Sequence, residues 1–293
     1  MALTKLKGFY QPSTLREAAG LLHKHADNAL IIGGGTFIHG LVARGLINDV
    51  EYLVDLSSLG LNDIDVSKKL VSFGASTTFA EIEANKLICE SILLGSINDA
   101  IAYPPPQIKH AATIGGCVAA SCPFLDLPIS LLALDASAVV MGRFFKRKIK
   151  FEDLFVSLFG HSMKSGEFIA NIILPHPELP TASAFQKLET NANDLAILNC
   201  AVRISIDNGL CVDARVFIGG GVGETPFRSL EVEQALNNRP LSMEVFSNAA
   251  SLVNESFDPL SDHRASSDYR KAMAGVFVKR CLVKVAERLG VEL

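Results

Sequence analysis

The sequence has no excess of positive charge and no long uncharged apolar run. It contains 27 Lys and Arg residues against 31 Asp and Glu residues, and the formal net charge of -4 argues against a nucleic-acid-binding surface. The longest apolar stretch, Leu127 to Val140, is interrupted by Asp135 and is shorter than the roughly 18 uncharged residues of a membrane span. Because the opening segment MALTKLKGFYQPSTLREA has no apolar h-region, we expect no signal peptide and a cytoplasmic location.

Common catalytic and metal-binding motifs are also missing. The six cysteines show no paired CxxC spacing, which favours buried free thiols over disulfides or metal ligands. There is no GxGxxG fingerprint, since Ile38 stands where its third glycine would be, and no P-loop lysine follows the glycines. The histidines form no HExxH motif, and the segment GHSM lacks the closing glycine of a nucleophile elbow. We therefore expect neither a catalytic residue nor a metal ligand in this chain.

The sequence does contain enough apolar residues for a large core. A chain of 293 residues with 49% hydrophobic and 20% charged residues has the composition of a soluble protein of about two domains. The proline-rich segment PHPELP interrupts the pattern of helices and strands. It predicts a domain boundary, with one domain at residues 1–176 and a second at residues 177–293.

Hydrophobic periodicity and capping residues predict helices and strands in both domains. In the first domain we expect helices over 14–25, 91–102 and 127–134, and strands over 29–32, 52–56, 136–141 and 168–174. From residue 70 a strand, a turn and a helix are expected, with Thr77 or Thr78 and Glu81 at capping-box spacing. The second domain is expected to hold antiparallel strands, joined by a hairpin turn at Asp207-Asn208-Gly209, and then helices over 230–237, 242–254 and 267–289.

Two glycine-rich segments are candidates for a phosphate cradle. They are ALIIGGGTFIHG, residues 29–40, and ATIGGCVAASCPFLDLP, residues 112–128. Glycines let successive N–H groups converge on one anion without an intervening side chain. Two such loops, far apart in sequence, favour one large phosphorylated ligand held from two sides over two ordinary turns. A third run, Gly219 to Gly223, is expected to be a turn that ends a strand.

Two charged residues next to apolar runs are further candidates. Asp126, in PFLDLP, is either the N-cap of the helix over 127–134 or a hydrogen-bond acceptor for a ligand hydroxyl or ring nitrogen, and the sequence leaves both open. Lys187, in AFQKLE, could neutralise a phosphate or stabilise an electron-rich ring. On the sequence alone, its position in an alternating strand favours an ordinary surface lysine.

Ordered motifs along nearly the whole chain carry a resemblance to a known family. They are YQPSTLREAAGLL, IIGGGT, VDLSSL, FGASTTFAEIE, PPPQIK, TIGG with PFLDLP, FQKLETNANDLA and SDHRASSDYRKAMAGVFVKR. In these motifs the chain resembles the FAD-binding medium subunit of the molybdenum hydroxylases, the family of xanthine dehydrogenase, carbon monoxide dehydrogenase and nicotinate dehydrogenase. So many matches in order are far more specific than either glycine segment alone.

The resemblance implies an α+β fold in which FAD is the cofactor. This is a two-lobed vanillyl-alcohol-oxidase (PCMH) type FAD-binding fold, with lobes at about residues 1–60 and 61–176, plus a small α+β carboxyl-terminal domain. Asp126 would bond a polar part of FAD, Ile169 would pack near the isoalloxazine, and Lys187 would lie near the flavin. The residues that the resemblance assigns to the two pyrophosphate loops are Gly33, Gly34, Gly35, Thr36, Phe37 and Ile38 in the first and Thr113, Ile114, Gly115, Gly116 and Cys117 in the second.

The sequence departs from the family pattern at several positions. Cys117 stands where the family usually has Asn, Ala112 where it has Gly, and Lys109-His110 where it commonly has Arg-Asn. Pro104 replaces a small residue that is usual near the flavin. Because the change at Cys117 removes a side-chain amide and leaves the backbone N–H groups, we expect altered flavin affinity or potential with FAD binding retained.

The function that the resemblance implies is electron transfer within a heteromeric oxidoreductase. A large partner subunit with molybdopterin would hydroxylate the substrate, a small partner subunit with iron-sulfur clusters would pass single electrons, and the FAD of this chain would deliver them to an external acceptor. The assembly would be a dimer of heterotrimers. Two alternatives stay open: a stand-alone FAD oxidoreductase of the same fold, and a flavin-free structural subunit.

Overall fold

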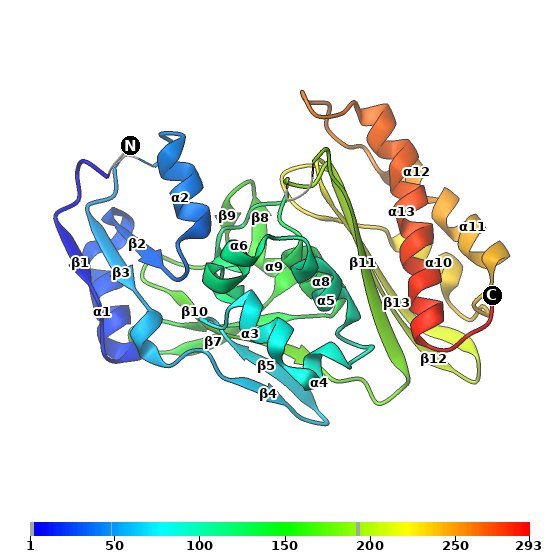
Figure 1. The fold of residues 1–293 in the computed structure, drawn as a ribbon, viewed down its shortest axis with the longest axis horizontal. Helices are drawn as coiled ribbons and strands as arrows, with labels where there is room; N and C mark the ends of the chain where they lie inside the picture. Colours follow the sequence, from blue (N-terminus) through cyan, green and yellow to red (C-terminus); the bar gives the residue numbers. More distant parts are fainter. Residues whose placement is uncertain (1–2, 48, 192–193) are drawn as a thin grey trace.

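The chain folds into three successive parts that lie side by side, each built on its own β-sheet (Figure 1). The structure, a computed structural model, describes residues 3–47, 49–191 and 194–293, so Ala192 and Asn193 of the FQKLETNANDLA motif lie outside the described residues. The three parts are here called the first lobe (residues 8–59), the second lobe (residues 64–175) and the C-terminal domain (residues 181–288).

The first lobe contains a three-stranded parallel sheet in the order β1-β3-β2. Its elements are β1 (Gly8–Tyr10), α1 (Leu15–His25), η1 (Ala26–Asn28), β2 (Ala29–Ile32), α2 (Thr36–Ala43), β3 (Tyr52–Asp55) and η2 (Ser57–Leu59). The hydroxyl of Thr14 accepts from the N–H of Glu17, which satisfies one of the groups that the start of α1 leaves unpaired. The strands expected over 29–32 and 52–56 are confirmed as β2 and β3, and their parallel pairing across α2 forms a β-α-β unit.

The second lobe contains a five-stranded antiparallel sheet in the order β4-β5-β10-β6-β7 and a separate hairpin of β8 and β9. The strands are β4 (Ile64–Val66), β5 (Leu70–Gly74), β6 (Ser137–Met141), β7 (Lys146–Lys150), β8 (Phe155–Ser157), β9 (Gly160–His161) and β10 (Phe168–Pro175). The helices are α3 (Phe79–Ala84), α4 (Lys86–Cys89), α5 (Gly95–Ala102), α6 (Pro106–Ala111), α7 (Ile114–Ala119), α8 (Leu127–Ala133) and α9 (Phe151–Leu154).

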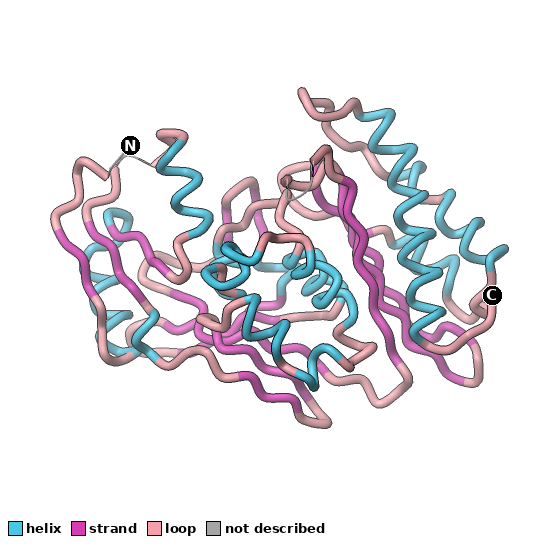
Figure 2. Tube along the Cα trace, viewed as in Figure 1, coloured by secondary structure: helices cyan, strands magenta, loops and turns pink. Residues whose placement is uncertain are grey.

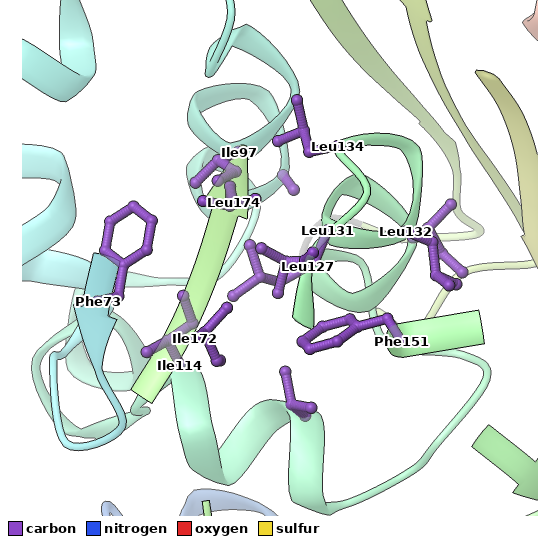
Figure 3. Close-up of a cluster of buried hydrophobic side chains, with 14 of the residues drawn as sticks. Phe73, Ile97, Ile114, Leu127, Leu131, Leu132, Leu134, Phe151, Ile172 and Leu174 are labelled. Atoms are coloured by element: carbon purple, nitrogen blue, oxygen red, sulfur yellow. The ribbon is translucent and has the colours of Figure 1, made fainter. Parts of the chain in front are cut away.

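The main core lies between one face of this sheet and the helices of the second lobe. Phe73 and Ile172 from the sheet, Ile114 from α7, Leu131 from α8 and Phe151 from α9 meet there (Figure 3). None of these side chains is more than 1% exposed, and burying each one fully contributes about 1.5–3 kcal/mol to folding. The core therefore fixes α7 and α8, which carry two of the predicted site segments, against the sheet.

The C-terminal domain contains a four-stranded antiparallel sheet in the order β11-β12-β13-β14. Its elements are β11 (Thr181–Leu188), β12 (Leu198–Asp207), β13 (Leu210–Gly220), β14 (Phe227–Arg228), α10 (Leu230–Leu236), α11 (Met243–Ser251), α12 (Val253–Ser256) and α13 (Ser267–Arg288). Asn208 and Gly209, with φ of 49° and 79°, form the predicted hairpin turn. The long helix α13 covers one face of the sheet, while α5 and α8 of the second lobe contact the other face (Figure 2).

Differences from the sequence prediction mostly involve short elements. The prediction missed the strands β1, β4, β7, β8, β9 and β14 and the short helices α4, α6 and α9, and it started α5 at Ser91 instead of Gly95. The segment predicted as a second glycine loop forms the short helix α7, so that prediction was wrong about its backbone. The Thr78–Glu81 capping box is confirmed. Among the described residues, no helix combines the length and the apolar character needed to cross a bilayer.

Candidate cofactor-binding site

The first predicted loop presents a row of unused N–H groups. Residues Gly33 to Gly35 connect β2 to α2, and Gly35 has a φ of 68°, a left-handed conformation that favours glycine. Within the described part of the chain, no hydrogen bond is formed by the N–H groups of residues 33–38, and the first helical bond of this segment runs from the N–H of His39 to the carbonyl of Gly35. Unpaired N–H groups at a helix start bind anions. The six predicted residues of this loop therefore have the donors that a pyrophosphate requires.

The N–H groups of the second segment already donate hydrogen bonds to other groups of the protein. Thr113 caps α7 and accepts the N–H of Gly116 at 3.2 Å, while its carbonyl accepts the N–H of Cys117 at 2.9 Å. The N–H groups of Ile114 and Gly115 donate to the carbonyls of Thr77 and Ala75, each at 2.9 Å. The segment therefore offers glycine surface and the Thr113 hydroxyl, whereas the free N–H groups belong to the first loop.

The two segments lie against each other across the two lobes. A Cβ placed on Gly34 would lie 1.5 Å from the carbonyl oxygen of Ala111, and a Cβ on Gly33 would lie 2.8 Å from Oγ1 of Thr113. Such distances are far inside van der Waals contact, so only glycine allows this approach. Phe37 of α2 also meets Phe159 of the β8–β9 turn, with ring centroids 6.1 Å apart. The expectation that the two segments converge is thus supported by their packing.

Asp126 lies in a buried polar cluster at the start of α8. It occupies the N-cap position of α8, which is one of the two expected interpretations, but its side chain forms no capping bond. Its carboxylate instead accepts from Nζ of Lys187 at 2.9 Å and from Nδ2 of Asn199 at 2.9 Å. Burial raises the pKa of Asp126 above its ordinary value, while Lys187 and Asn199 act in the opposite direction.

Lys187 is not the exposed surface residue that its strand pattern favoured. Its side chain is only 4% exposed, because α5 and α8 cover the face of the C-terminal sheet from which it projects. Besides Asp126, the ammonium group contacts Glu189 at 3.1 Å and lies 5.0 Å from the ring centre of Tyr103. Two carboxylates therefore already compensate the charge of Lys187, so it is not a free cation that awaits a phosphate.

Ile169 and Cys117 belong to the surroundings of the main core of the second lobe. Ile169, in β10, is 4% exposed and belongs to the same core cluster as Ile114, against which Cys117 packs. Cys117 is half-buried, and burial, followed by the nearby Asp126 charge, raises the pKa of its thiol. Cys117 is therefore a neutral thiol, and its proximity to Asp126 connects the second glycine segment with the Asp126–Lys187 cluster.

Sequence reasoning missed three residues of this cluster. Tyr103 stands directly before the proline run, Glu189 lies two residues after Lys187, and Asn199 lies in β12 opposite Lys187. The expected pairing of antiparallel strands would have suggested Asn199, since directly opposed side chains share a face. No feature of the sequence signals that Tyr103 of the second lobe meets Lys187 of the C-terminal domain.

The two lobes and their converging glycine segments define a protein that holds an extended phosphorylated cofactor. Residues 4–177 match the model of the FAD binding domain in molybdopterin dehydrogenase, and residues 183–285 match that of the CO dehydrogenase flavoprotein C-terminal domain. The chain therefore belongs to the FAD-binding medium subunits of the molybdenum hydroxylase family, and its cofactor is FAD. It is an oxidoreductase subunit with the expected α+β fold.

Similar proteins are alike over nearly their full length. The chain is 31% identical over 278 residues to the 6-hydroxypseudooxynicotine dehydrogenase complex subunit alpha of Paenarthrobacter nicotinovorans, which covers 94% of this chain and 93% of that protein. It is 28% identical to the glyceraldehyde dehydrogenase medium chain of Sulfolobus acidocaldarius, with 95% and 98% covered. A chain of the solved carbon monoxide dehydrogenase from Oligotropha carboxidovorans superposes with a TM-score of 0.90 at 26% identity, with 98% and 100% covered.

Proposed function

We propose that this chain is the electron-transfer subunit of a heteromeric molybdenum hydroxylase. It would take electrons from the iron-sulfur clusters of a small partner subunit and pass them to an external acceptor, while a large molybdopterin subunit acts on the organic substrate. The names of its relatives, a medium chain and a complex subunit, support a multi-subunit assembly, for which we propose a dimer of heterotrimers. We also propose that the domains divide at residues 176 and 177, and that the protein is cytoplasmic.

The observation that carries this proposal is the row of unused N–H groups in the first loop. Gly33, Gly34, Gly35, Thr36, Phe37 and Ile38 would hold the pyrophosphate of FAD through these donors, which lie at the positive end of α2. When bound, FAD can accept electrons singly and release two together. The chain itself has only to bind the cofactor, orient it and exclude water.

The second glycine segment would form the wall of the FAD site that faces the first loop. The exposed Gly116 leaves room for the cofactor to approach the backbone, and Thr113 adds a hydroxyl, whereas Gly115 is buried against Ala75. The N–H groups of Ile114 and Cys117 already donate to the carbonyls of Thr77 and Thr113. Cys117 presents a neutral thiol where the family usually has an amide. Its effect is therefore expected on flavin affinity or potential, through the lost hydrogen bond, and not through charge.

Asp126, Ile169 and Lys187 would lie toward the flavin ring. Asp126 is held in place by Lys187 and Asn199, so a polar edge of the cofactor would meet an oriented acceptor. Ile169 would contribute apolar surface beside the isoalloxazine. In this arrangement Lys187 is a positioning residue, because both of its ionic contacts are carboxylates of this chain.

Flavin binding is tested by a pair of glycine variants. Gly34→Ala introduces a Cβ into the contact with Ala111 and is expected to abolish or strongly reduce the visible flavin absorbance of the purified protein. Gly40→Ala is the matched control, because a Cβ at this position in α2 meets nothing closer than 3.9 Å. Folding of both variants is checked by circular dichroism. Full flavin content in folded Gly34→Ala would contradict the placement of FAD on this loop.

The electron-transfer role is tested on the purified complex after FAD is removed. The organic substrate should still reduce the iron-sulfur centres, whereas reduction of the external acceptor should stop and return when FAD is added. A complex that reduces its acceptor equally without FAD would support the flavin-free structural subunit. Activity of the isolated chain on an organic substrate would support the stand-alone oxidoreductase.

A further inference from the structure

A cavity of about 570 Å³ lies at the junction of the second lobe and the C-terminal domain, away from the glycine segments. It is lined by the ends of β5, β6, β7 and β10, by α8 and α9, and by β13 and β14. No residue of 33–38 or 113–117 contributes to its lining. Its volume lies within the roughly 300–1,000 Å³ of small-molecule sites.

The charges that line this cavity divide into two groups. Arg215 pairs with Asp135 and Asp213, and Arg228 pairs with Glu152 and Glu233, so both guanidinium groups are neutralised and held in place. The second group is Lys69, Lys148 and Lys150, whose side chains form no ion pair with any residue in the described ranges. Three uncompensated ammonium groups therefore remain for a ligand.

The three lysines line the cavity from different parts of the second-lobe sheet. Lys148 and Lys150 are two residues apart in the edge strand β7, so their side chains leave the sheet on one face, opposite the core residue Ile149. Lys69 directly precedes β5, and all three residues line the cavity. Lys148 and Lys150 are neighbours on β7, whereas Lys69 is separated from them by β10 and β6, so the two β7 lysines are the cations suited to one anion with several oxygens.

A recess with both charged and aromatic side chains in its lining continues the cavity. A second hollow of about 200 Å³ shares Leu132, Phe151, Glu152 and Arg228 with it. Its remaining walls come from the apolar or small residues Phe155, Phe217, Thr225 and Pro226. A ligand that fills both would place an anionic group against the lysines and a flat aromatic group beside Phe155, Phe217 and Pro226 in the recess.

We propose that this cavity is a second ligand site, which binds a phosphorylated small molecule carrying a flat aromatic group. The proposal is independent of FAD, because the FAD loops line neither hollow. The lysines attract the phosphate, and Phe155, Phe217 and Pro226 of the recess favour a ligand that also carries an aromatic ring.

The test titrates ADP, pyrophosphate and adenosine into FAD-saturated protein by calorimetry. ADP is expected to bind, pyrophosphate to bind more weakly, and adenosine to give no measurable heat. Saturation with FAD occupies the first glycine loop, residues 33–38, which is the other phosphate-binding site that we propose. The flavin absorbance of the same sample reports independently whether FAD is bound, so failure of the proposed function is recognised separately.

Two double variants decide whether the cavity is responsible. Lys148→Ala with Lys150→Ala should weaken ADP binding about tenfold or more, because two charge-assisted hydrogen bonds are lost. Lys68→Ala with Lys146→Ala removes the same charge from exposed neighbours that do not line the cavity, and should leave ADP binding unchanged. No binding of ADP to the FAD-saturated protein, or equal binding by the two double variants, would overturn the proposal.

Discussion

Two carboxylates share one ammonium group in the buried cluster of Asp126, Lys187 and Glu189. With all three ionised the cluster carries one net negative charge, and the side chain of Lys187 is 4% exposed against 12% for Asp126 and 20% for Glu189. Charges removed from water in this way are stable only when each keeps its partner. The cluster is therefore a place where one substitution has a large effect.

Removing the cation is expected to destabilise the protein strongly. Lys187→Met leaves two carboxylates without their shared partner and should lower the free energy of unfolding by about 3–5 kcal/mol, measured by urea denaturation. The pKa of Asp126, already raised by burial, should rise further, so the variant should recover stability as the pH is lowered through that pKa. Lys86→Met, which removes an exposed cation paired with Glu90, serves as control. A loss no larger than that of the control would refute the argument.

For single residues of the site, the sequence predicted which residues are candidates but not what surrounds them in the fold. The role of the glycines in the first loop could be predicted because a strand followed by three glycines indicates either an ordinary turn or a phosphate-binding loop. The burial of Lys187 could not, since period-two alternation shows only which face of β11 a side chain leaves. The cover on that face comes from α5 and α8, and Asp126 is 61 residues away in the chain.

A single carboxylate joins the helix α5 of the second lobe to the helix α13 and the strand β11 of the C-terminal domain. Asp99, in α5, accepts from Arg288 and Lys284 of α13 at 2.7–2.9 Å and from the N–H of Phe185 in β11 at 3.0 Å. Burial alone would raise the pKa of Asp99, but the hydrogen bonds from Arg288, Lys284 and Phe185 outweigh it, and the pKa is lowered. Asp99 thus connects the second lobe to the C-terminal domain as an anion.

This connection should be lost in acid. Because the folded pKa of Asp99 lies below its unfolded value, its contribution to stability is present above the ordinary carboxyl pKa of about 3.9 and is lost as the pH falls through the folded pKa. Asp99→Asn should reduce the free energy of unfolding by about 1.5–3 kcal/mol at neutral pH and by less at low pH. Urea denaturation at several pH values measures this. The exposed Glu90→Gln should change little, and a pH-independent loss in Asp99→Asn would contradict the assignment.

Among the elements, those with their own start and stop signals could be predicted. Thr14, Thr78 and Ser266 cap α1, α3 and α13, and each stands at a recognisable capping position in the sequence. The hairpin at Asn208-Gly209 follows from residues that accept positive φ. Short strands such as β4 and β7 depend on partners far along the chain, and α7 contains two glycines that hide its helical character.

Across the whole molecule, the first lobe has much the smallest core. Of the residues that the structure describes, eight buried ones form its cluster, and two of them, Phe168 and Ala170, come from β10 of the second lobe. So small a core gives limited stability of its own, and the lobe depends on its neighbour. FAD held between the glycine segments would add contacts on both lobes, so its binding should stabilise the first lobe in particular.

Hydrogen exchange measured by mass spectrometry, with and without FAD, tests this arrangement. Peptides covering residues 33–38 should exchange rapidly in the FAD-free protein, because their N–H groups have no acceptor within the described chain, and slowly once a pyrophosphate accepts them. FAD at a hundred times its Kd should stabilise the fold by about 2.7 kcal/mol, which slows exchange from the rest of the first lobe. Residues 114–117 should be slow in both states, since their N–H groups already have partners in the protein. The strands β12 and β13 serve as an internal control. If FAD protected residues 114–117 more than residues 33–38, the pyrophosphate would belong to the second segment, and the division of roles between the two segments would be wrong.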